Sequence, residues 1–401
     1  MSSATATDPG ATPSRAILLL ALASFVGAAN LRVCDALLPQ IAAELGITIG
    51  SAASMVTAFA VAYGVCQIIV GPLGDARGKL LLVVLGSLWA GVATLLCALM
   101  PSLAPLVLFR FLAGAGAAAV IPLAIAWIGD VVPYERRQAL LARYISGQIL
   151  GIVFGQAAGG LFGELIGWRA TLLLLGSAHI GAGLLLLNEQ RRLRAGLTSP
   201  RQPRWIEAAR AAYRLVRLPW VRVVLISVFI EGTAMFGALA YVGADLHARF
   251  GLGLGMVGAF LAAFGAGALL FAASASWLVP KLGQPRLAAT GTLLLAGGYA
   301  TLAGMPWLWL AAPAIAGLGL GFYMLHNTLQ VNATQMAPQA RGLAVSLFAF
   351  FLFTGQSIGV ALGAPVVDRF GARPVFATAA IVLLSIGFWF RAQLIKHTPA
   401  K

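Results

Sequence analysis

The sequence predicts an all-α membrane protein in which twelve transmembrane helices form two six-helix halves. The composition is one reason, because 60% of the 401 residues are hydrophobic and only 10% are charged, whereas a soluble domain has about 25% charged residues. A series of long apolar stretches is another, since a membrane-spanning helix needs about 20 apolar residues. Backbone groups in lipid must form hydrogen bonds within their own segment, so we expect each stretch to be a helix.

Twelve stretches have the required length, six on each side of a polar region. They lie near residues 16–38, 50–72, 80–100, 104–128, 139–162, 168–188, 222–245, 254–279, 287–305, 308–332, 342–366 and 374–392. The first is too long for a signal-peptide core and lacks a basic cluster before it, so we expect it to stay as a helix. We expect a cytosolic tail, a first half, a cytosolic linker, a second half and a second tail. Their ranges are 1–15, 16–188, 189–221, 222–392 and 393–401.

The basic residues predict the orientation of the chain. With both termini in the cytosol, four Lys or Arg residues lie outside and two lie within spans, which leaves 21 of the 27 on the cytosolic side. The six exceptions are Arg169, Arg249, Arg369, Arg373, Arg32 and Arg110. This is the positive-inside bias of membrane proteins. The net charge of +15 therefore indicates contact with anionic membrane lipid rather than with nucleic acid. We expect a multi-pass protein of the bacterial inner membrane.

The expected linker ends in a basic amphipathic stretch. Trp205 and Tyr213 are interleaved there with Arg210 and Arg214. A stretch of this kind is typical of a helix that lies on a membrane surface, here the cytosolic leaflet. The alternative is a regulatory or partner-binding segment.

The two expected halves resemble each other at an offset near 205 residues. Gly46-Ile-Thr-Ile-Gly50 matches Gly251-Leu-Gly-Leu-Gly255, and Gly167-Trp-Arg169 matches Gly371-Ala-Arg373 at an offset of 204. Chance does not preserve one offset across corresponding loops. A parallel repeat of this kind places a substrate site between the halves, near the middle of the membrane.

The segment Gly71-Pro-Leu-Gly-Asp-Ala-Arg-Gly-Lys79 separates the second and third stretches. Gly and Pro break helices, and the charges of Asp75, Arg77 and Lys79 do not sit in hydrocarbon without partners. We therefore expect a short loop outside the bilayer. Asp75 is favoured there by the dipole of the following helix, and the two basic side chains can pair with acids or helix ends of the second half. The alternative is a tight, solvated turn.

These motifs resemble the major facilitator superfamily over the whole chain. Residues 71–79 resemble its signature loop between helices two and three, and Arg110 with Gly114 and Gly116 resembles its second motif. The resemblance implies the major facilitator fold and a transporter. It also implies that one group of residues forms a cytosolic latch that stabilises the state open to the outside. That group is Gly71, Asp75, Arg77, Gly78 and Lys79.

Asp35-Ala-Leu-Leu-Pro-Gln-Ile-Ala42 resembles the bacterial efflux branch of that family. This branch includes drug/proton antiporters and sugar-efflux permeases similar to the arabinose exporter. Its antiporters often carry a glycine–proline motif in helix five. The present chain has Gly151, Gly155 and Gly159 in that helix, with Gln156 where the proline would stand. We expect the small residues to permit close helix packing.

Ionisable groups inside spans are costly and are functional candidates by default. Arg32 and Asp35 are three residues apart on one face of the first helix, and Arg110 lies at a similar depth in the fourth. A carboxylate between two guanidinium groups can load or release a proton when a substrate or a conformational change alters its surroundings. The alternative is a static ion pair, or for Arg32 a side chain that reaches the lipid interface.

Glu231 lies about 13 Å beyond Arg222 along the seventh helix. We expect it to bind a proton or a cationic substrate, and the alternative is a neutral, hydrogen-bonded acid. Polar residues of the tenth and second helices are further candidates for lining the same cavity. They are His326, Asn327, Gln330, Tyr63 and Gln67. His179 is assigned to packing.

These features predict a secondary active transporter that exports small organic molecules by alternating access, coupled to inward proton movement. A sugar or metabolite permease or uniporter is the alternative within transport, and a non-transporting sensor or assembly factor is the alternative from another class. The sequence has no nucleotide-binding loop, metal-ligand spacing or nucleophile constellation, so we expect no enzyme activity, cofactor or metal. Cys34, Cys66 and Cys97 fall in different helices and predict no disulfide. We expect a monomer.

Overall fold

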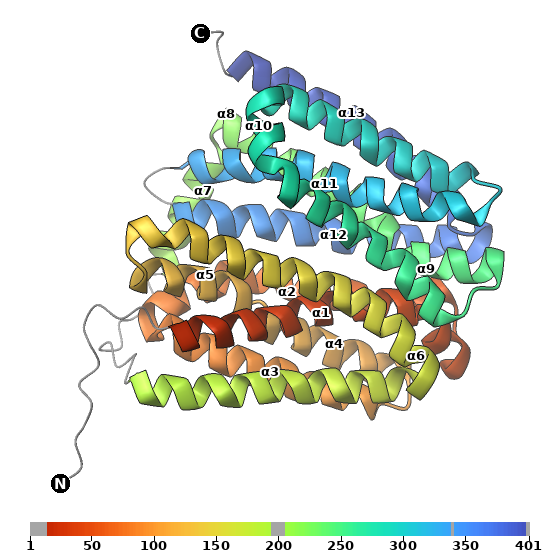
Figure 1. Cartoon of the computed structure of the whole chain (residues 1–401), viewed down its shortest axis with the longest axis horizontal. Helices are drawn as coiled ribbons and strands as arrows, with labels where there is room; N and C mark the ends of the chain where they lie inside the picture. Colours follow the sequence, from red (N-terminus) through yellow and green to blue (C-terminus); the bar gives the residue numbers. More distant parts are fainter. Residues whose placement is uncertain (1–13, 194–204, 338–340, 398–401) are drawn as a thin grey trace.

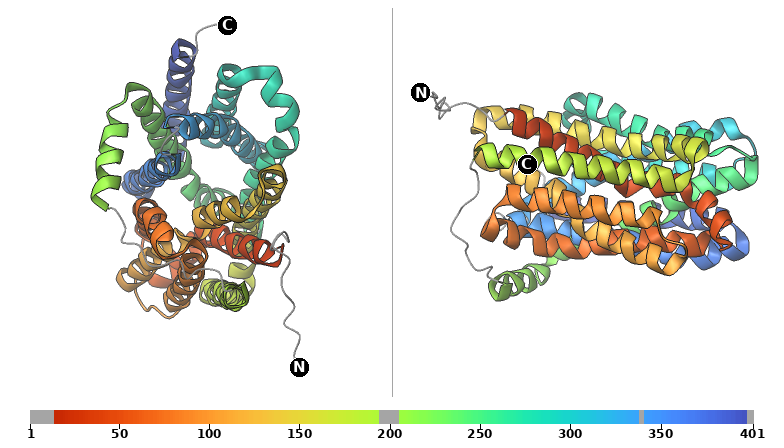
Figure 2. Two further views of the ribbon diagram at one scale, coloured as in Figure 1. Left: turned by 90° about the vertical axis from the view of Figure 1, so that its left-hand side faces the viewer. Right: turned by 90° about the horizontal axis from the view of Figure 1, so that it is seen from below.

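The computed structural model describes residues 14–193, 205–337 and 341–397. These residues form a bundle of long helices with roughly parallel axes, and the described part contains no strand (Figure 1). Seen end-on, the helices up to residue 193 occupy one side of the bundle and those from residue 205 occupy the other (Figure 2). Residues 1–13 and 398–401 of the expected tails, and residues 194–204 of the expected linker, lie outside the described residues.

The elements fall into two groups in chain order. The first group is α1 (Ser14–Leu45), α2 (Ile49–Arg77), α3 (Lys79–Ala98), α4 (Leu103–Ala117), α5 (Val120–Val131) and α6 (Tyr134–Leu193). The second group is α7 (Trp205–Val216), α8 (Pro219–Glu231), the π-helix η1 (Gly232–Phe236), α9 (Gly237–Phe250), α10 (Leu254–Gly304), the 3-10 turn η2 (Leu308–Leu310), α11 (Ala311–Gln335), α12 (Arg341–Phe370) and α13 (Arg373–His397).

Ten helices of the described chain are long and apolar enough to cross a membrane, compared with the twelve spans expected from the sequence. The difference lies in α6 and α10, which contain 60 and 51 residues, whereas one crossing needs about 20. Each is interrupted by one glycine with positive φ, Gly167 (84°) in α6 and Gly283 (66°) in α10. The backbone departs from helical geometry at that glycine, so each turn is shorter than the loop that the sequence suggested.

The two parts of α6 run in opposite directions. Before Gly167, its residues 151, 155 and 159 contact residues 25, 29 and 33 of α1 in the same order. After Gly167, Gly176 and Gly183 contact Leu95 and Leu88 of α3 in reverse order. Because α1 and α3 are joined through α2 by two short turns, they point the same way. The chain therefore reverses at Gly167.

Glycines bring two pairs of helices into direct backbone contact. A Cβ added at Gly151, Gly155 or Gly159 would overlap a backbone carbonyl of α1. In the second group, Gly355 and Gly359 of α12 press in the same way on the backbones of Phe229 in α8 and Thr233 in η1. Each of these second-group residues lies 204 positions after the first-group residue that makes the same contact, so the internal repeat of the sequence is also present in the helix packing. Small residues allow such an approach where lipid provides no hydrophobic drive between helices.

The described ends of the chain lie at one end of the bundle. Arg15 at the start of α1 pairs with Glu189 near the end of α6 (3.2 Å). Trp220 at the start of α8 stacks on His397 at the end of α13 (3.9 Å between ring centroids). We call this the basic end, because Lys79 and the last-turn residues Arg191 and Arg192 of α6 also lie there. The other end, which holds Arg169, Arg249 and Arg373, is the opposite end.

The prediction of a loop outside the helices at residues 71–79 was wrong. Helix α2 continues through Pro72 to Arg77, and α3 begins at Lys79. Only Gly78 leaves the helical conformation, at φ 100°. Glycine adopts this backbone freely, so one residue makes the turn. The glycines and the proline before it are tolerated because they lie within a packed helix end.

We expect Gly155→Ala to lower the midpoint of thermal unfolding in detergent. The added methyl group overlaps the backbone of α1, and overpacking of this kind costs about 1–3 kcal/mol. Gly181→Ala is the matched control in the same helix, because a Cβ there meets no atom within 4 Å. Equal midpoints for the two variants would contradict the packing described above.

Candidate functional site

Asp35 forms a buried ion pair with Arg32 on α1. Arg32 Nη1 donates to Asp35 Oδ2 at 3.3 Å, and the two residues are 2% and 0% exposed. The guanidinium lies 4.2 Å from the ring centroid of Phe236 in η1, so Arg32 points into the second group of helices and not toward a lipid interface. The second carboxylate oxygen, Oδ1, is buried without a hydrogen-bond partner in the described structure.

Arg110 has a different partner. Its Nη1 donates to Asn30 Oδ1 at 2.8 Å and its Nη2 to the Asn30 carbonyl at 3.2 Å, while its guanidinium covers the ring of Phe59 at 4.4 Å. No hydrogen bond joins Arg110 to Asp35 among the described residues. The reason is angular: Asn30 and Asp35 are five residues apart on one helix and point about 140° away from each other. The structure therefore gives the two guanidinium groups different hydrogen-bond partners, Asp35 for Arg32 and Asn30 for Arg110.

Asn30 is the centre of a polar network that sequence reasoning missed. Its Nδ2 donates to Thr94 Oγ1 at 2.8 Å and lies 3.5 Å from His179 Nδ1. His179, assigned to packing from the sequence, is fully buried and takes part in this network. The available signal was a neutral amide inside an apolar span, which needs a partner in lipid. A neutral side chain is less conspicuous there than an ionisable one.

Glu231 is the last residue of α8 and is fully buried. Its Oε2 lies 2.8 Å from Nδ1 of His326 on α11, and its Oε1 has no partner in the described structure. The chain continues directly into the π-helix Gly232–Phe236. Segments of π-helix are rare and are frequent at functional sites. Glu231 and Asp35 thus share one arrangement, in which one oxygen bonds a basic side chain and the other is unpaired.

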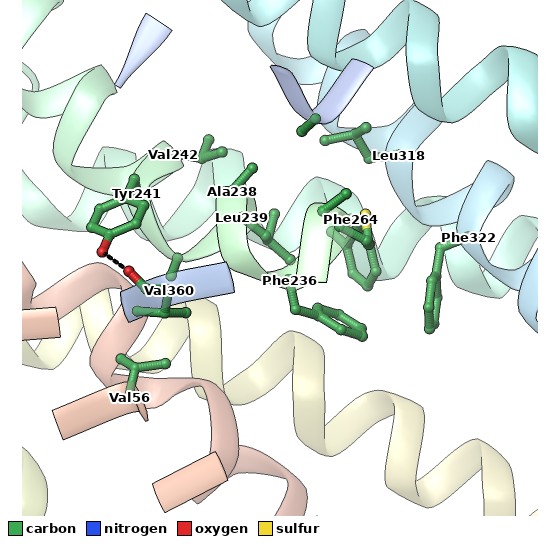
Figure 3. Packing of buried hydrophobic residues seen from close by; sticks show 14 of the residues in the cluster. Val56, Phe236, Ala238, Leu239, Tyr241, Val242, Phe264, Leu318, Phe322 and Val360 are labelled. Atoms are coloured by element: carbon green, nitrogen blue, oxygen red, sulfur yellow. Dashed lines mark hydrogen bonds between the residues drawn. The ribbon is translucent and has the colours of Figure 1, made fainter. Parts of the chain in front are cut away.

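An aromatic cluster lies between the two acid–base pairs. It consists of Phe236, Phe264, Phe322 and His326. The His326 ring stacks on Phe322 at 4.6 Å, and Phe322 meets Phe236 edge-on at 4.9 Å. Phe236 in turn carries Arg32 on its face. Figure 3 shows Phe236, Phe264 and Phe322 converging from η1, α10 and α11. The cluster therefore links the Glu231–His326 pair with the Asp35–Arg32 pair.

The remaining candidates for cavity lining are spread over several environments. Of the three polar residues expected on one face of α11, His326 contacts Glu231, Asn327 is half-buried and Gln330 is exposed. Tyr63 of α2 is buried against Phe353 of α12, with ring centroids 4.5 Å apart. Gln67 Nε2 lies at the limit of hydrogen bonding to the Ala118 carbonyl, at 3.5 Å.

The residues expected to form a latch are bonded within the first group of helices. Lys79 Nζ lies 2.6 Å from Asp130 Oδ2 and 3.3 Å from Asp75 Oδ1, and Arg77 is exposed. Between this segment and α12 is a cavity of about 580 Å³, which α2, α5, α7 and α12 line together with Lys79. The expected pairing with the second half is absent among the described residues. The cavity accounts for this, because it separates Asp75 and Lys79 from α12.

The protein family of the chain follows from its match to a family model. The model of the Major Facilitator Superfamily matches residues 20–360. The chain belongs to this superfamily. The expectation drawn from residues 71–79 and Arg110 is thereby confirmed. Membership in the superfamily makes the chain a multi-pass membrane transporter of small molecules and not an enzyme.

Similar proteins agree with this assignment. The MFS-type transporter YceJ of Bacillus subtilis is 27% identical over 357 residues, which cover 87% of this chain and 89% of the relative. A chloramphenicol resistance protein of Streptomyces lividans is 26% identical over 376 residues, covering 91% and 93%. A bacterial homologue of the human lysosomal transporter Spinster shares the fold, with a TM-score of 0.77 at 18% identity over 98% of this chain and 100% of that one.

We expect Asn30→Ala to destabilise this major facilitator protein strongly. The change removes the side-chain acceptor of Arg110 Nη1 and leaves the buried guanidinium with the residue-30 carbonyl on Nη2, and breaking a buried polar pair on one side costs about 3 kcal/mol. The readout is the midpoint of thermal unfolding in detergent. Asn327→Ala is the matched control, since that half-buried amide has no hydrogen bond among the described residues. An equally small effect of both changes would show that Asn30 does not compensate the charge.

Proposed function

We propose that this major facilitator transporter exports small organic molecules by alternating access, coupled to inward proton movement. The observation that carries the proposal is the pair of fully buried carboxylates, Asp35 and Glu231, each with one oxygen on a basic side chain and one oxygen unpaired. A buried carboxylate with an unpaired oxygen is costly. Binding a proton or a hydrogen-bond donor of a substrate relieves that cost, so the two ligands compete for the same atoms.

The aromatic cluster suits an organic substrate with an apolar ring. Phe236 and Phe322 offer ring faces and edges for stacking, and Asp35 Oδ1 and Glu231 Oε1 offer acceptors on either side. Protonation of either carboxylate weakens its bond to Arg32 or His326 and frees the base. The relative named as a chloramphenicol resistance protein supports drug-like molecules as the substrate class.

The proposed topology has twelve crossings, with both termini in the cytosol of a bacterium and the chain in its inner membrane. The reversal of α6 at Gly167 and the second positive-φ break at Gly283 support the count. The concentration of Lys and Arg at the basic end supports the orientation. On this topology α7 lies at the cytosolic face, with Arg210 and Arg214 placed to meet anionic lipid headgroups. We propose that the protein works as a monomer.

The segment from Gly71 to Lys79 is proposed as the cytosolic gate. The positive φ of Gly78 keeps α2 and α3 tightly joined, and a Cβ at Gly71 would lie 3.9 Å from Ser346 of α12. In the present structure the charges of this segment stay within the first group, beside the cavity. Closing the cavity brings the exposed Arg77 toward α12, where it stabilises the state open to the outside.

We expect Asp35→Asn and Glu231→Gln each to abolish most proton-driven accumulation. An amide, unlike a carboxylate, does not change its protonation state near neutral pH, so accumulation in proteoliposomes with an imposed pH gradient should fall at least about tenfold. Labelled chloramphenicol is the substrate probe, and a lumenal pH dye reports coupled proton flux. Glu44→Gln is the control acid, because Glu44 bonds Trp168 and Arg169 at the opposite end. Unchanged proton-driven accumulation and proton flux in both variants would contradict the proposed proton sites.

We expect Asp75→Asn to slow turnover while largely sparing substrate affinity. The change removes one carboxylate from the Lys79 pair and leaves the buried acids untouched. The comparison is transport rate against equilibrium binding of the same probe. Glu189→Gln, which removes the partner of Arg15 at the same end, is the control. A loss of affinity with unchanged turnover would rule out the gating role.

A further inference from the structure

Two carboxylates join the two groups of helices at the opposite end of the bundle. Asp368, near the end of α12, accepts hydrogen bonds from the Gly50 backbone N–H at 2.7 Å and from Thr48 Oγ1 at 2.7 Å. Glu164, just before the break in α6, accepts from the Gly255 N–H at 2.5 Å. In each case the acid belongs to one group and the donor to the other.

The two contacts are copies of each other in the internal repeat. Asp368 lies 204 residues after Glu164, and Gly255 lies 205 residues after Gly50, which are the offsets of the neighbouring loops. Gly50 is the second residue of α2, and Gly255 is the second residue of α10. Each group therefore supplies one acid and one helix start, and the pairing is reciprocal.

The placement of the acids has a clear electrostatic reason. The first N–H groups of a helix have no partner within it, and the helix dipole makes that end attractive to negative charge. A carboxylate that accepts such an N–H forms a charge-assisted bond. At Gly50 the approach is close, since an added Cβ would lie 2.6 Å from the Ala364 carbonyl oxygen. The glycine lets the start of α2 reach α12.

Each of these contacts is weak enough to break during a conformational change. Glu164 and Asp368 are both exposed, so water competes for their oxygens and keeps each bond weak. The two contacts also differ in strength, because the N-cap of α2 is Thr48, whose hydroxyl adds a second donor, whereas the N-cap of α10 is Gly253. Asp368 therefore holds its partner helix with two bonds and Glu164 with one.

We propose that Glu164 and Asp368 are a pair of reciprocal clamps that hold the opposite end closed while the basic end is open, and that both must release before a substrate leaves. The clamps rest on the proposed alternating access, and they add the residues that bias it. They act at the end remote from Asp75 and Lys79. Opening of that end separates α12 from α2 and α6 from α10, which breaks both sets of bonds together.

The test measures the distance between the two groups at the opposite end. Spin labels replace Ala43 and Trp307, which are exposed and lie on different groups, in full-length protein carrying Cys66→Ser and reconstituted in nanodiscs. We expect Asp368→Asn or Glu164→Gln to raise the ratio of separated to closed populations about threefold, and the double variant about tenfold. Thr48→Val, which removes one of two donors to Asp368, should give a smaller rise than Asp368→Asn.

The control is Glu44→Gln, an acid at the same end that bonds only its own group, through Trp168 and Arg169. It should leave the distances unchanged. Unchanged distances in the double variant, or an equal shift in the control, would overturn the clamps. The readout needs no transported substrate, so the clamps can stand if proton-driven chloramphenicol transport is absent, and they can fail while that transport is present.

Discussion

The cost of burying charge in an apolar bundle governs the arrangement of this transporter. Three buried ionisable side chains of the candidate site have a compensating group: Asp35 has Arg32, Arg110 has Asn30, and Glu231 has His326. In the described structure each of the three still has one buried atom without a hydrogen-bond partner, namely Asp35 Oδ1, Arg110 Nε and Glu231 Oε1. A fully paired interior would be a rigid core. The proposed binding of a proton or a substrate depends on the unpaired oxygens of Asp35 and Glu231.

Backbone contact through glycine sets the positions of the helices that carry Asp35 and Glu231. Because glycines let the backbones of α1 and α6, and of α8 and α12, touch at their closest approach, the helices that carry Asp35 and Glu231 are held close beside their neighbours. The aromatic cluster of the second group then packs against Arg32 of the first group through Phe236. Within the second group, Tyr241 donates to the Val360 carbonyl at 2.6 Å (Figure 3). Rigid pairs inside each group and polar or aromatic contacts between groups suit two bodies that rock against each other.

The helical class, the membrane-spanning lengths and the family could be predicted from the sequence, because they depend on composition, stretch length and short motifs. The buried ionisable residues Asp35, Arg110 and Glu231 could also be named from the sequence, since a buried charge is costly wherever it points, whereas the neutral Asn30 was missed. Partners were not. Arg110 bonds Asn30 because of the rotation of α1, and Lys79 bonds Asp130 because α2 stays helical to Arg77. Helix rotation and the exact end of a helix leave little trace in a single apolar sequence.

The π-helix after Glu231 accounts for a small irregularity in the repeat. Before it, Phe229 corresponds to Phe25 at an offset of 204, and after it, Gly251 corresponds to Gly46 at 205. A π-helical turn holds its hydrogen bonds one residue further apart than an α-helical turn. The second copy thus carries a single inserted residue that its helix absorbs without a loop. The insertion rotates α9 relative to α8 by about one residue, and the last residue of the π-helix, Phe236, is the one that packs against Arg32 of the first group. The two copies of the repeat therefore differ in helix register at the place where the two groups meet.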